Sequence, residues 1–186
     1  MKAVFLRHCA LLLALPITAC AAVQGGGAGA GAEVTRFHLG QPIARGQIAV
    51  EAFDPADANM PEFASYADAV GRELTRLGWT VVNSVGQSEQ VALVDVEQGT
   101  RAALRTGRVG TAAPGATGGG ATGPVATRLE VRIKRRSDGT VFWEGRSVMN
   151  TRGGANAADR TAIVQNLAAA LFRDFPGESG RTISAR

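Results

Sequence analysis

The sequence predicts an α+β fold: a two-layer sandwich with a mostly antiparallel sheet of about five to six strands and two helices on one face. Three observations support this prediction. The stretch Thr127–Met149 alternates apolar and charged residues on both sides of Ser137-Asp138-Gly139, which is the pattern of a β-hairpin. Two segments, beginning at Pro61 and Ala155, repeat apolar residues at steps of three and four, as amphipathic helices do. The other strand segments each have one apolar face, so a helix layer on one side of the sheet buries them all.

The register of the hairpin follows from its cross-strand pairs. A two-residue Asp138-Gly139 turn would place Ile133 opposite Glu144. A three-residue loop, Ser137–Gly139, places Ile133 opposite Trp143 instead. It also creates two opposite-charge pairs, Arg132 with Glu144 and Glu130 with Arg146, each worth roughly 0.2–1 kcal/mol. We therefore predict the three-residue loop, with Gly139 in the left-handed region.

The remaining elements are predicted in chain order. The strands are Val34–Leu39 with Phe37 or Leu39 inward, Gln47–Phe53, a strand starting at Trp79–Val82, and Val91–Val96 with an extension through Arg101. The first helix has a buried stripe ending at Leu77 and stops at Gly78, a left-handed cap. The second has a stripe of Ile163, Leu167, Ala170 or Leu171 and Phe175, and is ended by Pro176. Residues Gly177–Arg186 are predicted to be a polar tail.

The first nineteen residues, Met1–Ala19, have the pattern of a secretory signal. Lys2 and Arg7 precede an apolar run from Cys9 to Ile17, and small residues follow. That run is too short for a membrane-spanning helix, which needs about 20 apolar residues. An ordinary signal peptide remains the alternative to a lipoprotein signal.

The segment Ile17-Thr18-Ala19-Cys20 resembles the lipobox of bacterial lipoproteins. The resemblance implies cleavage before Cys20, a diacylglycerol thioether on its sulfur and an acyl chain such as palmitate on its amino group. Several chains hold a protein firmly at a membrane, because each buried methylene contributes about 0.8 kcal/mol. Ala21 stands where an aspartate usually signals retention in the inner membrane. This favours the periplasmic face of the outer membrane.

The mature chain is predicted to have one folded domain. Residues 20–32 comprise Cys20 and a Gly/Ala tether, whose reach is about 20 Å. The domain spans 33–186 and contains a low-complexity loop at 106–124, which lacks the lysine and the following helix of a phosphate-binding loop. The folded body is therefore expected close to the membrane surface.

Composition excludes several classes of site. The whole chain carries +4, but the signal removes Lys2 and Arg7 and no acid, which leaves 18 basic against 16 acidic residues, or +2. This is a weak case for nucleic acid, so none is predicted as a partner. With Cys9 removed and Cys20 acylated, neither a disulfide nor a Cys/His metal cluster is available. His38 is the sole mature histidine and is predicted to be a surface or edge residue, so no cofactor or metal is expected.

Two acidic segments are candidate sites. Asp54–Asn59 lacks the glycine and the final glutamate of an EF-hand loop, which favours acids leading into a helix. Asp95 and Glu97 share a strand face and form a candidate pair for general acid–base work. No nucleophile or histidine lies near them in the sequence, which favours a solvated strand end.

A set of motifs resembles domain-of-unknown-function family 4136, a group of small bacterial envelope lipoproteins. The set comprises the lipobox, Leu77-Gly78-Trp79, the strand around Trp143-Glu144-Gly145, and the final helix closing on Phe175-Pro176. The resemblance covers roughly Glu33–Gly177, and the insert Thr106–Pro124 departs from the family pattern. The family carries no established activity, so the resemblance implies no catalytic residue.

The sequence therefore predicts a non-catalytic envelope lipoprotein that binds a partner protein, a lipid head group or an anionic polymer, and leaves its oligomeric state open. An envelope hydrolase is the alternative, and a concave pocket with converging ionisable groups would distinguish it. The candidate contact with anionic surfaces is the basic hairpin face of Arg128, Arg132, Lys134, Arg136 and Arg146, with an excess of about three positive charges. Trp143 is predicted to be a core anchor.

Overall fold

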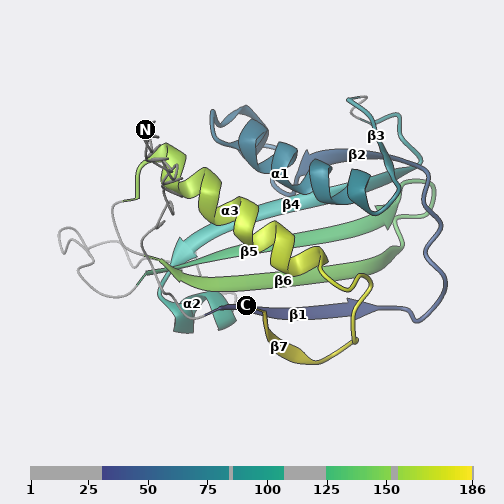
Figure 1. The fold of residues 1–186 in the computed structure, drawn as a ribbon. Coiled ribbons are helices and arrows are strands. Elements are labelled where there is room, and N and C mark those ends of the chain that lie inside the picture. The colour runs from purple at the N-terminus through teal and green to yellow at the C-terminus, as the bar shows by residue number, and fades with distance from the viewer. Residues whose placement is uncertain (1–30, 84–85, 107–124, 152–154, 186) are drawn as a thin grey trace, which may run out of the picture.

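The computed structural model describes residues 31–83, 86–106, 125–151 and 155–185 (Figure 1). In these ranges the chain forms one seven-stranded sheet in the order β3-β2-β4-β5-β6-β1-β7. The strands are β1 Ala32–His38, β2 Gln47–Ala52, β3 Thr80–Val81, β4 Gln90–Gly99, β5 Val125–Arg135, β6 Val141–Thr151 and β7 Thr182–Ala185. Of the six pairs of neighbouring strands in these ranges, only β2–β3 and β2–β4 are parallel, so the sheet is mostly antiparallel, as predicted.

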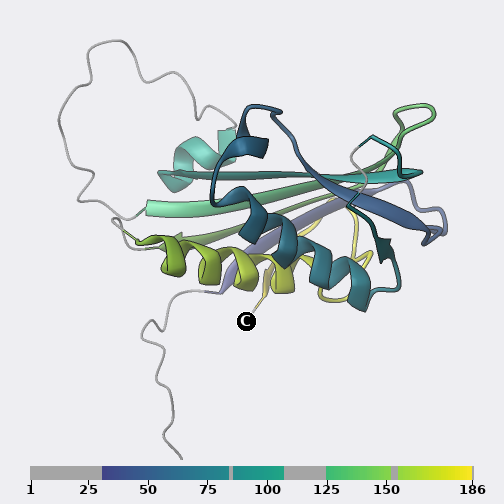
Figure 2. The same ribbon diagram turned by 90° about the horizontal axis from the view of Figure 1, so that it is seen from above.

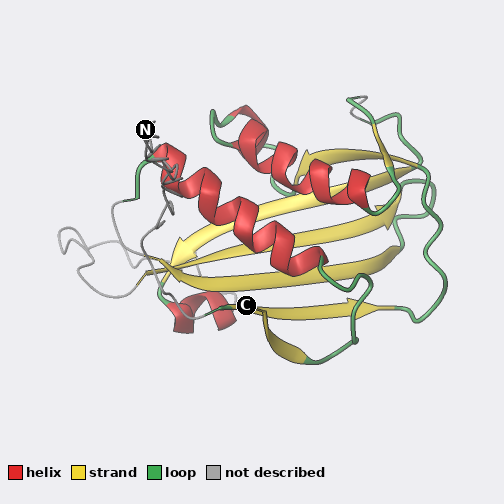
Figure 3. Cartoon of the chain, in the orientation of Figure 1, coloured by secondary structure: helices red, strands yellow, loops and turns green. Residues whose placement is uncertain are grey.

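The two long helices lie side by side on one face of the sheet (Figures 1 and 3). They are α1, Phe63–Arg76, and α3, Ala157–Phe172. The view from above shows the short helix α2, Arg101–Thr106, on the opposite face (Figure 2). A 3-10 turn, η1, spans Asp57–Asn59 between β2 and α1. The predicted α+β sandwich with two helices on one face is thus confirmed, with one more strand than expected and a small third helix.

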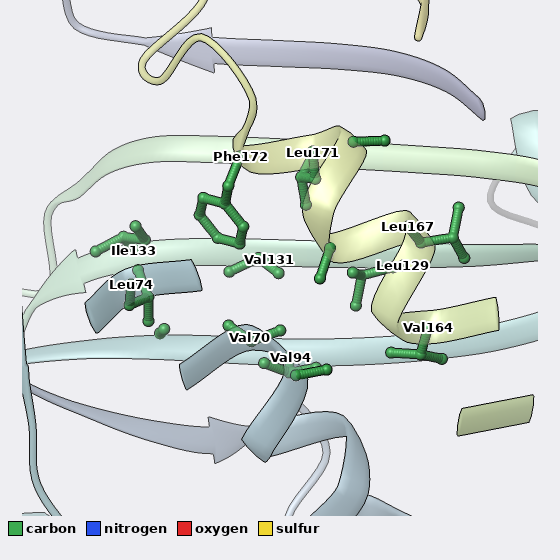
Figure 4. Close-up of a cluster of buried hydrophobic side chains, with 14 of the residues drawn as sticks. Val70, Leu74, Val94, Leu129, Val131, Ile133, Val164, Leu167, Leu171 and Phe172 are labelled. Atoms are coloured by element: carbon green, nitrogen blue, oxygen red, sulfur yellow. The ribbon is translucent and has the colours of Figure 1, made fainter. Parts of the chain in front are cut away.

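The core lies between the helices and the sheet (Figure 4). Leu129, Val131 and Ile133 of β5 are fully buried beneath α1 and α3. Full burial of each such side chain contributes about 1.5–3 kcal/mol. The helices supply Val70, Leu74, Val164, Leu167, Leu171 and Phe172 from their facing sides. Alternation along β5 thus places every second residue in the core, as the sequence pattern predicts.

Trp143 anchors one end of this core and is fully buried, which confirms its predicted place. Its ring stacks on Phe172 with centroids 5.2 Å apart and contacts Phe175 at the same separation. Its indole N–H donates to the carbonyl of Pro176 at 3.0 Å. Gly145 lies beneath the ring, where a Cβ atom would stand 2.3 Å from Trp143 Cη2. The glycine is therefore required by close packing.

The predicted register of the hairpin is confirmed, but its loop is not the predicted one. Ile133 pairs with Trp143 and Val131 with Gly145, and the two opposite-charge pairs form as well. However, Arg135 pairs with Thr140 through its N–H at 3.0 Å, which leaves four loop residues. A bulge follows Ile133 and adds one residue on β6. The extra loop residue shifts the strand pairing by one residue and the bulge shifts it back, so the predicted pairs from Ile133–Trp143 onward still form. Gly139, at φ 70°, occupies the predicted left-handed conformation.

The side chains of β1 that face the core are not the ones that the sequence predicted. Phe37 and Leu39 are 48% and 59% exposed, whereas Val34 and Arg36 are buried. The register of β1 on β6 decides this, because it places Arg36 beside Gly145 on the helix-covered face. The Arg36 guanidinium then donates to the carbonyls of Leu171 and Ala170 at 2.8 and 3.0 Å. Its charge is placed at the negative end of α3, which is a favourable position for a cation.

Three predicted boundaries were wrong. Strand β4 ends at Gly99, and Arg101 begins α2 instead of extending the strand. Helix α3 ends at Phe172, before Pro176, because Arg173 leaves the helical conformation, with ψ 155°, and Asp174 has φ 41°. The polar tail is not free: β7 pairs with β1, and Thr182 bonds Thr35 through their hydroxyls at 2.7 Å. A short polar strand is acceptable at a sheet edge, where one face meets water.

Candidate functional site on the open face of the sheet

The sheet face opposite α1 and α3, here called the open face, carries a lattice of charged side chains. Alternation along β5 directs Arg128, Glu130 and Arg132 to this face, between the residues that enter the core. Neighbouring strands add opposite charges: Asp95 and Glu97 from β4, and Glu144 and Arg146 from β6. The lattice is therefore built across three adjacent antiparallel strands.

Glu130 is the centre of the lattice and is only 5% exposed. It pairs with Arg132 at 2.5 Å and with Arg146 at 3.0 Å. Burial by itself raises the pKa of Glu130, but the hydrogen bond from Arg146 and the charges of Arg146, Arg132 and Arg128 outweigh it. The pKa therefore lies below its usual range. Glu130 is ionised and holds its arginine neighbours in place.

Arg128 is the most deeply buried cation of the lattice, with a side chain 7% exposed. Its Nη2 lies 3.1 Å from Asp95, 2.7 Å from Glu97 and 3.8 Å from Glu130. Its Nη1 donates to the carbonyl of Leu104 at 3.1 Å, which attaches α2 to the open face. Asp95 and Glu97 are therefore not a solvated strand end, as the sequence favoured, because both face a buried arginine.

A depression of 560 Å³, the open-face depression, lies beside this group. Its lining comes from the end of β2, from η1, and from β4 and β5, and comprises Phe53, Asp54, Pro55, Asp57, Asp95, Val96, Glu97, Arg128, Glu130 and Arg132. Five carboxylates and two guanidiniums give the lining a formal charge of −3. Phe53 is 47% exposed, and the Arg132 guanidinium lies over its ring at 4.5 Å. The depression thus combines carboxylates, guanidiniums and an aromatic ring.

The pKa of Glu97 is shifted in the opposite direction to that of Glu130. Burial raises the pKa of Glu97, and the nearby charges of Asp95 and Glu130 raise it further. Arg128 opposes this effect but does not overcome it. The Glu97 carboxyl is therefore more readily protonated than a free glutamate, whereas Glu130 on the adjacent strand is less so.

The structure distributes the five predicted basic contact residues unevenly. Arg128, Arg132 and Arg146 belong to the lattice, and Lys134 lies two residues after Arg132 on β5. Arg136 lies beyond the strand and pairs with Glu51, and its Nε contacts Ser88 Oγ at 3.3 Å.

The estimate of about three excess positive charges counted only Glu130 and Glu144 on this face. Asp95, Glu97 and Glu51 add three more carboxylates, which pair with Arg128 and Arg136. The error arose because the neighbours of β5 were not known from the sequence. Contact with an anionic surface through these residues stays a prediction.

Phe53 was not recognised as a site residue from the sequence, and Asp54 and Asp57 were considered only as cation ligands, with acids leading into a helix favoured instead. They follow β2, which runs parallel to β4, so the ends of both strands meet at one end of the sheet. The sequence signal was present in the acids after the second strand, but only the parallel pairing brings them to Asp95 and Glu97. In the described ranges, no group of three or more His, Cys, Asp or Glu side chains is placed to hold a metal ion.

His38 has a structural role. Its Nδ1 accepts from the Gly40 N–H at 3.1 Å, and its Nε2 lies 3.0 Å from the Gly177 carbonyl. Because Nδ1 is the acceptor, the proton belongs on Nε2, which then donates to Gly177. The ring joins β1 to the turn after α3 and is half-buried.

A second hollow of 530 Å³ lies between α1 and the β2–β3 edge. Its lining is mainly small or aliphatic, with Ala49, Val50, Ala67, Gly71, Val81 and Val82 joined by Asp68, Arg72, Thr75 and Asn83. It presents one carboxylate and one guanidinium. The open-face depression is therefore the richer in ionisable groups.

The lipid-attachment residue Cys20 and the glycine-rich part of the 106–124 loop lie outside the described residues. Across the described ranges, no helix is both long enough and apolar enough to cross a membrane.

Comparisons with known proteins identify a relative and a likeness of fold. No family model matches the chain, so the resemblance to family 4136 stays a prediction. An uncharacterized protein of Zymomonas mobilis, ZMO1243, is 26% identical over 81% of this chain and 78% of its own length. Among solved structures, a PDZ domain protein of Parabacteroides distasonis has a TM-score of 0.50 at 11% identity, covering 83% of this chain and 39% of that one. A PelC dodecamer of Paraburkholderia phytofirmans has a TM-score of 0.43 at 15% identity, covering 74% of this chain and 92% of that one.

Proposed function

We propose that the protein is a lipid-anchored, non-catalytic binding module at the periplasmic face of the bacterial outer membrane. The observation that carries the proposal is the lipobox-like Ile17-Thr18-Ala19-Cys20 followed by a Gly/Ala stretch that leads directly into β1 at Ala32. A short tether of that composition keeps the folded body close to the membrane that holds the acyl chains.

A recognition role fits the chemistry of the open face. Arg128, Arg132 and Arg146 are engaged by carboxylates, and no histidine or cysteine lines the open-face depression. Preorganised ionic groups beside an exposed aromatic ring are typical of a site that orients a polar ligand. This supports binding as the role of the face.

The anchor is tested by Cys20→Ser. We expect the wild type to fractionate with membranes and to carry lipid on Cys20 by mass spectrometry. The variant should lack that lipid and be released from the membrane fraction. Ala21→Ser, which leaves the cysteine intact, serves as the control and should behave as the wild type. Full membrane retention of Cys20→Ser together with an unmodified wild-type cysteine would refute the anchor.

An envelope hydrolase is the second candidate, and one observation favours it. Glu97, whose pKa is raised by burial, shares the depression with Asp95, which meets the criterion of a concave site with converging ionisable groups. Of the two carboxyls, Glu97 is the one whose pKa is raised, and a raised pKa favours the protonated form that a general acid needs. Turnover of an envelope polymer that is lost in Glu97→Gln would establish this alternative.

A further inference from the structure

Three buried side-chain atoms in the described part of the chain have no hydrogen-bond partner: Glu97 Oε2, Arg128 Nε and Arg132 Nε. All three residues line the open-face depression. Buried polar groups in native proteins are nearly always satisfied, so an unsatisfied group needs an explanation, such as a bound molecule. The concentration of these atoms at one hollow points to a ligand there.

The ion pairs at these atoms do not satisfy them. Glu97 Oε2 lies 2.7 Å from Arg128 Nη2, yet the contact lacks the direction of a hydrogen bond. Arg132 Nε is 3.5 Å from Glu144, which is longer than a good N–H···O bond. The Arg128 side chain is 7% exposed, so bulk water has little access to its Nε. Each atom keeps a free hydrogen-bonding capacity.

The unsatisfied groups define the chemistry of the ligand. Two are N–H donors and one is a carboxylate acceptor, so the ligand must both accept and donate at short spacing. A hydroxyl group does both at once, with one O–H and two lone pairs. A run of neighbouring hydroxyls, as on a sugar ring, therefore matches the set.

Charge and shape narrow the ligand further. The lining carries a formal −3, which disfavours phosphate, uronate and other anions. Phe53 offers apolar ring surface at the rim, where the C–H face of a sugar can pack. The volume of 560 Å³ falls within the range of small-molecule sites, about 300–1,000 Å³.

We propose that the open-face depression binds a neutral saccharide unit, with hydroxyls bridging Glu97 to the Arg128 and Arg132 Nε–H groups and one ring face on Phe53. This deepens the proposed binding role by naming its ligand class, and it rests on that role. Its test is independent of the anchor, because membrane fractionation of Cys20→Ser does not involve the depression.

The test uses the full chain in detergent, titrated calorimetrically with two neutral probes, chitotriose and maltotriose, and with the anionic probe trigalacturonate. We expect at least one neutral probe to bind with a Kd of about 1 mM or tighter, and trigalacturonate to bind at least about tenfold more weakly. Glu97→Gln and Phe53→Ala should each weaken the neutral probe by about tenfold, the loss of one charge-assisted bond or one ring contact.

Matched controls distinguish the site from the rest of the surface. Phe37→Ala removes a phenylalanine of nearly equal exposure, 48% against 47% for Phe53, from β1 instead of the turn after β2. Glu178→Gln removes an exposed carboxylate that pairs with Arg181. Both should bind the probes as the wild type does, and circular dichroism should show every variant folded.

Three results would overturn the inference: no heat from either neutral probe with a folded chain, equal weakening in the control variants, or tighter binding of trigalacturonate. The first would assign the three atoms to ordered water. Shortened saccharide products after incubation would support the ligand class and would replace the non-catalytic role with the hydrolase.

Discussion

The two faces of strand β5 are both buried, but by opposite means. Leu129, Val131 and Ile133 are covered by two helices and belong to the apolar core. Arg128 and Glu130, at 6% and 5% exposure, are almost as inaccessible on the open face, although neither α1 nor α3 lies there. Opposite charges on β4 and β6, together with α2, exclude water from them.

The two faces of β5 contribute differently to stability and to binding. Apolar burial is non-directional and stabilises the fold in proportion to area. A buried ion pair recovers little more than its desolvation cost, yet removing one partner leaves a buried charge uncompensated. We therefore infer that the helix-covered face supplies most of the stability. The charged face holds polar groups in fixed positions, as a binding site requires.

The largest expected effect is on the helix-covered face, at Trp143→Ala. The change removes a fully buried ring that stacks on Phe172, and truncation of such a residue costs about 3–5 kcal/mol of unfolding free energy. Denaturant melts measure it. Phe37→Ala, on an exposed ring, should stay within about 0.5 kcal/mol of the wild type. Similar losses in both variants would contradict the assignment of Trp143 to the core.

Gly145→Ala tests the packing of the same face by adding a methyl group, whereas Trp143→Ala removes a ring. The new Cβ would meet Trp143 Cη2 at 2.3 Å and Leu171 Cδ1 at 2.8 Å. Overpacking of this kind costs about 1–3 kcal/mol, and we expect the upper part of that range because both neighbours are buried. Gly46→Ala is the matched control, since its Cβ would meet only Glu89 Oε2 at 3.5 Å. A neutral Gly145→Ala would mean that the tryptophan ring can move.

Glu130→Gln tests the charged face. Breaking a buried pair costs about 3–5 kcal/mol, but Arg132 and Arg146 are 31% and 35% exposed, so we expect about 2 kcal/mol at pH 7. Because the folded state lowers the pKa of Glu130, its contribution is present above the unfolded pKa and is lost as pH falls through the folded pKa. Melts from pH 7 into acid should therefore converge with the wild type. A loss independent of pH would argue for packing instead of charge.

Glu97→Gln has the smallest expected effect, and its sign is opposite. The folded state raises the pKa of Glu97, so stability falls as pH rises through that pKa. At pH 7 the neutral glutamine should be more stable by about 0.5 kcal/mol, and the difference should vanish below the unfolded pKa of glutamate. Thermal melts at several pH values measure it. Destabilisation at pH 7 would show that the pair with Arg128 outweighs the burial of Glu97.

The β5–β6 hairpin shows which structural features the local sequence pattern can predict. Alternation and charge pairing predicted the partners of Ile133 and Glu130, because side chains on neighbouring strands must match face by face. The four-residue loop and its compensating bulge were missed, because the pairs fix only the register beyond the bulge. Helix positions were predicted from their periods, whereas the end of α3 was set by backbone after Phe172 that has no periodic signal.

Most of the candidate site could not be predicted from the local sequence pattern. Asp95 and Glu97 were noted as a pair on one strand face, and the arginines of β5 as another set. That β4 lies beside β5, and that β2 delivers Phe53 and Asp54 to the same hollow, depends on strand order. A strand's sequence states which residues share a face. It does not state which strand lies next to it.

The sequence by itself determined the alternation of β5 and β6 and the amphipathic helices, and it predicts the lipid anchor at Cys20. Each of these is encoded by residues close together in the chain. Only the tertiary structure decided that the tail forms β7, that Arg36 enters the core and that five carboxylates line one depression together with Arg128 and Arg132. These depend on contacts between distant segments, where burial raises the cost of an unpaired charge and so selects the partner.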